Sequence, residues 1–104
     1  MKISGFQVLG VANNGEEAVL MFKSFSIKPD IILMDHRMPV KNGIETTKEI
    51  LKIDNSAYII FVSADLSVKE DSLSIGAKLF IEKPFSLDKL INILKNAVLV
   101  QNIS

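Results

Sequence analysis

The chain has 104 residues, of which 48% are apolar, so one packed domain is expected and intrinsic disorder is not. Its 12 basic residues balance its 12 acidic ones, which gives no sign of a nucleic-acid or anionic-membrane partner. The absence of cysteine excludes disulfides and thiolate chemistry, and no apolar run approaches the roughly 20 residues of a membrane span. We therefore expect a cytoplasmic protein.

The first predicted unit is a strand near residues 7–12 followed by a helix from Gly15 to about Phe25. Asn and Gly residues between the two supply turn chemistry, because both tolerate positive φ. Glu16 and Glu17 lie in the first turn of the helix, where carboxylates complement the helix dipole.

The second and third units begin with apolar runs at residues 31–34 and 58–62, which predict strands buried on both faces. A helix from Asn42-Gly43 to about Ile53 separates them. Ser67 is a plausible N-cap of the next helix, because Glu70 follows three residues later as in a capping box.

The fourth unit is a strand near residues 79–82, ended by Pro84, and a helix from Leu87 to about Leu99 capped by Ser86. One helix thus separates each pair of strands. This alternation is typical of a parallel sheet with right-handed crossovers, an α/β doubly wound fold of four βα units.

The last predicted helix has more apolar residues than one buried stripe needs. Two faces can be drawn, one through Leu87, Leu90, Ile91, Leu94 and Val98 and another through Ile93, Ala97 and Val100. The helix is either part of a short domain with an apolar tail or a surface that also covers a partner.

Three polar residues follow successive predicted strands: Asp35, Ser63 and Lys83. A parallel sheet brings the carboxyl ends of its strands to one edge, where open α/β sheets bind their ligands. There Asp35 can attack phosphorus as a nucleophile, the Ser63 hydroxyl can bind a phosphate oxygen, and Lys83 can neutralise one. The bond between Lys83 and Pro84 is a candidate cis peptide.

Each of these residues also has an ordinary structural interpretation. An aspartate at a strand end is more often a cap or turn former, a serine there is usually a terminator, and a lysine before proline is usually solvated. Their joint occurrence at the same end of three strands is what favours a phosphoryl site.

The chain resembles the receiver domains of two-component response regulators. Asp35 through Pro39, with Gly43 eight residues after the aspartate, is similar to their D-x-x-M-P-x-x-x-G segment. Further stretches of the same family are similar to residues 12–18 (ANNGEEA), 61–64 (FVSA) and 76–85 (GAKLFIEKPF). The resemblance covers nearly the whole chain and implies a flavodoxin-like receiver fold, with residues 1–104 as a single domain and no output domain.

The same resemblance assigns roles to individual residues. It implies that Asp35 is the phospho-acceptor, that Ser63 with Ala64 and Lys83 bind the phosphoryl group, and that Phe80 holds the aromatic switch position. Phe80 lacks a tyrosine hydroxyl, so any change of its rotamer would act by packing alone.

The resemblance also implies a metal and a set of partners. Magnesium would be bound by Asp35 and the backbone carbonyl of Arg37, with the Arg37 side chain and Asp65 bordering the phosphate. A sensor histidine kinase or a phosphotransfer protein would donate the phosphoryl group. The last two strand–helix units would contact a downstream protein, with no nucleic acid and no membrane involved.

The sequence departs from the family at its beginning. Receiver domains open with a strand that ends in two adjacent acidic residues, followed by a first helix, and this chain matches neither. Because magnesium takes its oxygen ligands largely from carboxylates, the metal site is expected to be incomplete and magnesium binding weak or absent. Met1 could be an internal methionine of a longer receiver, or the chain could be a degenerate receiver.

The missing strand would leave two apolar strands with unpaired edges, which favours association. The strand near residues 7–12 could instead close up against residues 31–34, a second copy could cover the gap, or the N-terminal segment could hang loose. Self-association, for example as a homodimer, is the favoured expectation.

The sequence leaves two alternatives to a phospho-acceptor. A phosphorylation-independent pseudo-receiver would use the same fold as a docking surface, and the missing acidic pair favours it. A hydrolase with an aspartyl-phosphate intermediate would commonly carry a second aspartate where Arg37 stands, so an enzyme is not expected. His36, the only histidine, has no evident partner and is interpreted as a loop residue.

Overall fold

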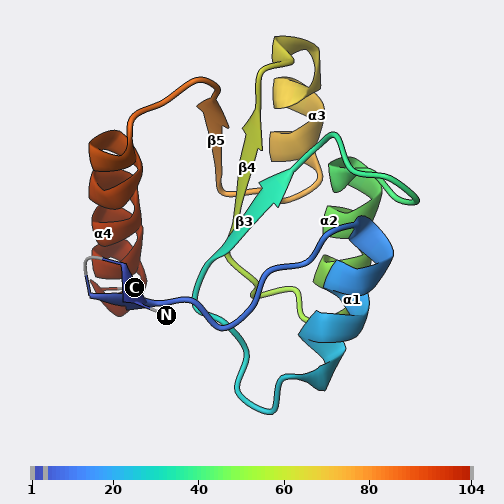
Figure 1. The fold of residues 1–104 in the computed structure, drawn as a ribbon, viewed down its shortest axis with the longest axis horizontal. Coiled ribbons are helices and arrows are strands. Elements are labelled where there is room, and N and C mark those ends of the chain that lie inside the picture. The colour runs from blue at the N-terminus through green and yellow to red at the C-terminus, as the bar shows by residue number, and fades with distance from the viewer. Residues whose placement is uncertain (1, 4, 104) are drawn as a thin grey trace.

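The computed structural model describes the backbone of residues 2–3 and 5–103 and the side chains of residues 5–98. Its central layer is a parallel sheet in the order β3-β4-β5, with strands at Ile32–Asp35, Ile59–Ser63 and Leu79–Glu82. Figure 1 shows α1, α2 and α3 on one side of this sheet and the long α4 on the other. The α/β class and the doubly wound parallel arrangement are confirmed.

Three of the four helices in the described residues begin after a residue whose side chain caps them. Their bounds are α1 Gly15–Ser24, α2 Gly43–Ile53, α3 Lys69–Ser74 and α4 Leu87–Ile103. The side-chain oxygens of Asn14, Asn42 and Ser86 each accept a hydrogen bond from the backbone N–H three residues on, at 2.8, 2.9 and 3.1 Å. These bonds satisfy donors that the first helical turn leaves free, so they fix the helix starts.

The start of α3 differs from the prediction. A 3-10 turn, η1 at Leu66–Val68, precedes it, and the N-cap of α3 makes no side-chain hydrogen bond. The Oδ1 of Asp65 accepts both the backbone N–H of Ser67, at 2.9 Å, and its hydroxyl, at 2.5 Å. The capping box with Glu70 is therefore wrong, because Ser67 lies inside the 3-10 turn that Asp65 caps, rather than at the N-cap of α3.

The predicted strand near residues 7–12 is also wrong. Only Phe6–Gln7 (β2) is paired, in a short antiparallel ladder with Lys2–Ile3 (β1), and no backbone hydrogen bond in the described chain ties residues 8–12 to β3. At Gly10 the segment lies beside α1 instead, since a Cβ on this glycine would come within 2.6 Å of the Met21 Sδ. The sheet consequently has three strands rather than four, and the outer edge of β3 stays open.

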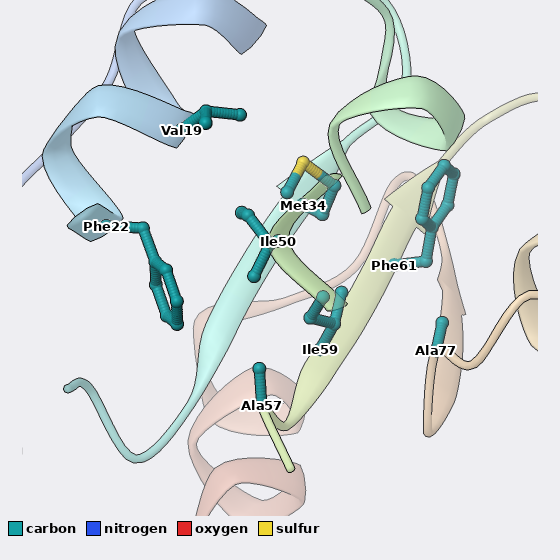
Figure 2. Close-up of a cluster of buried hydrophobic side chains, with 8 residues drawn as sticks. All are labelled: Val19, Phe22, Met34, Ile50, Ala57, Ile59, Phe61 and Ala77. Carbon is teal, nitrogen blue, oxygen red and sulfur yellow. The ribbon is translucent and has the colours of Figure 1, made fainter. Parts of the chain in front are cut away.

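The main core lies between the sheet and the three helices on its first face. Figure 2 shows its buried side chains converging from α1, α2, β3 and β4 and from the segments that precede β4 and β5. Its members are Val19, Phe22, Met34, Ile50, Ala57, Ile59, Phe61 and Ala77. All five residues of β4 are buried, which agrees with the two-sided burial that its apolar run predicts.

A second, smaller core lies under α4. Ile60, Val62 and Ile81 of the sheet meet Ala97, with Leu90, Ile93 and Leu94 packed around them. The helix thus uses members of both of its predicted apolar faces, while the side chains after Val98 lie outside the described residues. None of the helices in the described part of the chain has the length and apolar content needed to traverse a bilayer.

Candidate functional site

The three polar residues singled out from the sequence lie at one edge of the sheet. Asp35, the last residue of β3, pairs in register with Val62, the residue before Ser63 at the end of β4. Lys83 follows β5 directly, and its backbone N–H donates to the Ser63 carbonyl at 3.1 Å. The peptide bond between Lys83 and Pro84 is cis, as the sequence suggested.

Asp35 and Lys83 are in direct contact. The Lys83 Nζ lies 2.5 Å from the Asp35 Oδ2, although the two residues are 48 positions apart in the sequence. The other carboxylate oxygen, Oδ1, accepts the Arg37 backbone N–H at 3.3 Å. The side chains of Asp35 and Lys83 are 45% and 40% exposed, so an incoming group can reach the carboxylate beside its cation.

Ser63 lies at this edge, but its hydroxyl faces elsewhere. The side chain is buried, and its Oγ accepts the backbone N–H of Asp65 at 3.0 Å. Alternation along β4 places Ser63 on the opposite face from Val62 and therefore from Asp35. The structure brings Asp35 and Lys83 together and leaves Ser63 turned toward the following loop, with the exposed Ala64 next to it.

Phe80 is half-buried on the side of the main core. Its ring stacks on Phe61 with centroids 6.2 Å apart and an interplanar angle of 16°. Phe61 in turn packs against His36 at 5.8 Å. An aromatic series therefore leads from β5 to the residue after Asp35, a connection that the apolar run of β4 gave no reason to single out.

His36, interpreted from the sequence as a loop residue, has a partly buried side chain and a carbonyl that organises the loop. Its Nδ1 is buried without a hydrogen-bond partner among the described residues, while its carbonyl accepts the N–H groups of Met38 and Gly43 at 3.1 and 2.9 Å. A Cβ on Gly43 would lie 2.6 Å from the Asp35 carbonyl oxygen, so this position requires glycine. The loop between β3 and α2 is thus wound closely around the end of β3.

Lys41, in the same loop, was missed by sequence reasoning. Its ammonium lies 2.6 Å from Glu49 of α2 and 3.3 Å from Glu16 of α1. The hydrogen bond with Glu49 is the largest cause that raises the pKa of Lys41 above its ordinary value. The residues are distant in sequence and follow no common period, so only the fold reveals the contact.

Asp65 is close enough to Arg37 and His36 for their charges to affect its acidity. The Ser67 hydroxyl, followed by the Ser67 backbone N–H and then the charges of Arg37 and His36, lowers the pKa of Asp65. The lowered pKa favours the ionised form of Asp65 at neutral pH.

The donor set for a metal ion is small. No group of three or more His, Cys, Asp or Glu side chains in the described residues is arranged to hold one. Asp35 supplies the carboxylate at this edge, already paired with Lys83, and the Arg37 carbonyl would add one neutral oxygen. Magnesium prefers six oxygen ligands and usually draws charge from carboxylates, so these residues do not form a complete site for it.

The amino-acid sequence is similar to those of known proteins. The response regulator receiver domain family matches residues 1–95. The chain is 44% identical over 93 residues to the chemotaxis protein CheY of Thermotoga maritima, covering 88% of this chain and 76% of that protein. It is 43% identical over 90 residues to CheY of Bacillus subtilis strain 168, covering 85% of this chain and 73% of that protein.

A solved structure agrees in fold. A chain of the CheX–CheY–BeF3–Mg complex from Borrelia burgdorferi superposes with a TM-score of 0.83 at 33% identity, covering 90% of this chain and 72% of that one. Sequence and structure thus point to the same family across most of the chain. The chain belongs to the response-regulator receiver domains.

Proposed function

We propose that this receiver domain accepts a phosphoryl group on Asp35. A carboxylate oxygen attacks phosphorus, the bond from phosphorus to the donor breaks, and the leaving group departs with the electron pair, which leaves an acyl phosphate. The contact between Asp35 and Lys83 carries this proposal, because the ammonium can neutralise charge that develops on the transferring group.

The same proposal includes a conformational role for Ser63 and Phe80. The Ser63 hydroxyl keeps its hydrogen while it accepts from Asp65, so it can donate to a phosphate oxygen if it turns toward Asp35. Ala64 lies beside it and would contribute its backbone N–H. Phe80 would respond by repacking against Phe61.

The proposed role is that of a cytoplasmic signalling switch with a protein on either side. A sensor histidine kinase or phosphotransfer protein would donate the phosphoryl group, and the last two strand–helix units would contact the downstream protein. CheY of Borrelia burgdorferi is found with CheX, BeF3 and Mg, which supports this kind of role for a relative. The chain would act by binding rather than by turning over a substrate.

We also propose that this chain binds magnesium weakly or not at all. The reason is the donor set above: no group of three or more His, Cys, Asp or Glu side chains in the described residues could hold a metal ion, and Asp35 is already paired with Lys83. Saturable binding of magnesium below the millimolar range, followed by titration calorimetry, would contradict it.

The phosphorylation proposal can be tested by intact mass. The chain is incubated with a small acyl-phosphate donor with and without magnesium, beside an Asp35→Asn variant that removes the nucleophile. We expect slow addition of one phosphoryl group to the parent chain and none to the variant. Equal labelling of both would overturn the assignment of Asp35.

The second candidate, a pseudo-receiver, is favoured by the incomplete donor set. It predicts no phosphoryl addition under any condition and the same affinity for a partner protein before and after exposure to the donor. A phosphoryl-dependent change in partner affinity excludes it.

Self-association is proposed through the open edge of β3. The strand contains neither proline nor lysine, the residues that commonly block pairing at an exposed edge, and its Leu33 is 45% exposed. Sedimentation should show dimers in the tens of micromolar range that Leu33→Lys disrupts. Leu20→Lys, on the exposed side of α1, is the matched control and should leave the dimer intact. A strictly monomeric parent chain contradicts the proposal.

A further inference from the structure

Lys41 joins the loop after Asp35 to two helices. Its side chain is only 16% exposed, and its ammonium contacts Glu49 in α2 at 2.6 Å and Glu16 in α1 at 3.3 Å. A shared cation between two carboxylates is more than the isolated exposed pair that usually contributes little. The backbone is close as well, since a Cβ on Gly15 would collide with the Lys41 carbonyl.

The residue before Lys41 has an unfavourable backbone conformation. Val40 has φ of 72°, and the Lys41 N–H donates across it to the Pro39 carbonyl at 2.8 Å. This is a γ-turn with a positive central φ, a rare and strained form, and a β-branched residue is especially poor there. The Val40 side chain is 80% exposed, so its own packing does not offset the strain. The neighbouring Lys41 contacts are positioned to hold the turn.

The other end of this loop orients the Asp35 carboxylate. The Arg37 N–H donates to Asp35 Oδ1, and the His36 carbonyl accepts the Gly43 N–H, which closes the loop between them. Val40 and Lys41 therefore lie inside a loop whose two ends are joined by this hydrogen bond. The carboxylate is thus held by Lys83 on one oxygen and by the loop on the other.

We propose that Lys41 is a positioning residue for chemistry at Asp35, holding the strained turn at Val40 and through it the Arg37 N–H. Lys41 does not touch Asp35, and the inference rests on the proposed phosphoryl transfer. Its role is to keep the carboxylate in one orientation while the two helices stay docked on the loop.

The test compares Lys41→Met with Lys48→Met, which removes a lysine from the exposed face of α2. Rates of phosphoryl addition are measured well below the unfolding temperature of each variant, and the Arg37 amide and Asp35 carboxyl signals are followed by NMR. Lys41→Met should react about tenfold more slowly and shift both signals, since small misplacements of reacting groups are costly. Lys48→Met should match the parent chain.

A second variant separates positioning from general stability. Adding Val40→Gly to Lys41→Met relieves the positive-φ strain, because glycine adopts this conformation readily. The rate and both NMR signals should return toward the parent values. Failure of glycine to restore them, or a parent-like rate and spectrum in Lys41→Met, overturns the proposal.

The two proposals can fail separately. If the parent chain accepts no phosphoryl group, the proposed function fails, but the Arg37 and Asp35 signals still report the orientation of the carboxylate. Unchanged signals in Lys41→Met then refute the positioning role. A shift that Val40→Gly reverses supports it.

Discussion

Asp54 and Asp65 each have a pKa that a nearby serine hydroxyl lowers. Asp54 accepts the hydroxyl and backbone N–H of Ser56, and Asp65 does the same with Ser67. In both cases the serine hydroxyl is the first cause, and the backbone N–H the second, of a lowered pKa. Because the geometry is repeated, each pair serves as the control for the other.

We predict that Ser67→Ala raises the pKa of Asp65 and leaves that of Asp54 unchanged, while Ser56→Ala does the reverse. A lowered carboxyl pKa in the folded state adds stability above the unfolded pKa, and this stability is lost as pH falls through the folded pKa. The difference in stability between parent and Ser67→Ala should therefore shrink in acid. Carboxyl NMR titration measures the pKa values, and a common shift in both aspartates would contradict the prediction.

The site residues differ in how far sequence could place them. Asp35 and Lys83 follow apolar strands, so the parallel sheet alone brings them to one edge. The direction of the Ser63 hydroxyl and the ion pairs of Lys41 depend on loop geometry, which has no sequence period. The contact between Phe61 and His36 could not be predicted either, since an aromatic residue in a buried strand is normally interpreted as part of the core.

Among the secondary-structure elements, α1 is capped at its C-terminal end by the side chain of Lys28, which follows the helix in the chain. The Lys28 Nζ donates to the Phe22 carbonyl at 2.6 Å and to the Phe25 carbonyl at 2.9 Å, and it lies 4.8 Å from the centre of the Phe22 ring. The last carbonyls of a helix have no partners within it, and a cation there also interacts favourably with the helix dipole.

Lys28→Met should lower the free energy of unfolding by about 1–2 kcal/mol, because charged hydrogen bonds to two helix-end carbonyls are lost. Lys23→Met, an exposed position in the last turn of α1, should change it by less than about 0.5 kcal/mol. Urea denaturation of both variants provides the measurement. Equal effects would show that the charge of the segment, rather than the cap, is what matters.

The elements that sequence predicted best are those whose signals are local. Cap residues and apolar runs placed β3, β4, β5, α1 and α2 to within a residue or two. Residues 8–12 have a strand-like composition, but a strand forms only beside a partner about 4.8 Å away, and Gly10 in this segment lies beside Met21 of α1 instead. The predicted start of α3 was wrong because Ser67 lies inside a 3-10 turn that Asp65 caps, one turn before the helix.

For the whole molecule, the two faces of the sheet are unequally filled. On the first face α2 buries Gly43, Thr46, Thr47 and Ile50. On the other, Ala97 is the one buried side chain among the described residues of α4. A shallow hollow of about 290 Å³ interrupts the packing there, lined by Tyr58, Leu79, Ile93, Asn96 and Ala97.

We therefore predict that α4 opens before α2 and β4. Local opening costs less where few side chains are buried, so amides of α4 should exchange with solvent faster than those of the other two elements. Hydrogen exchange measured by mass spectrometry under native conditions tests this order. Equal protection of α4 and α2 would show that the molecule opens only as a whole.

The unpaired segment at residues 8–12 affects the susceptibility of the protein to proteolysis. A protease needs an extended stretch of chain that it can draw into its cleft, and here Leu9 and Val11 present exposed side chains on backbone outside any ladder. A cut at this point would detach the N-terminal ladder while the Asp35–Lys83 pair remained in the larger fragment. Cleavage would begin away from Asp35, so a partner that shields this stretch would lengthen the lifetime of the protein without contacting the Asp35–Lys83 pair.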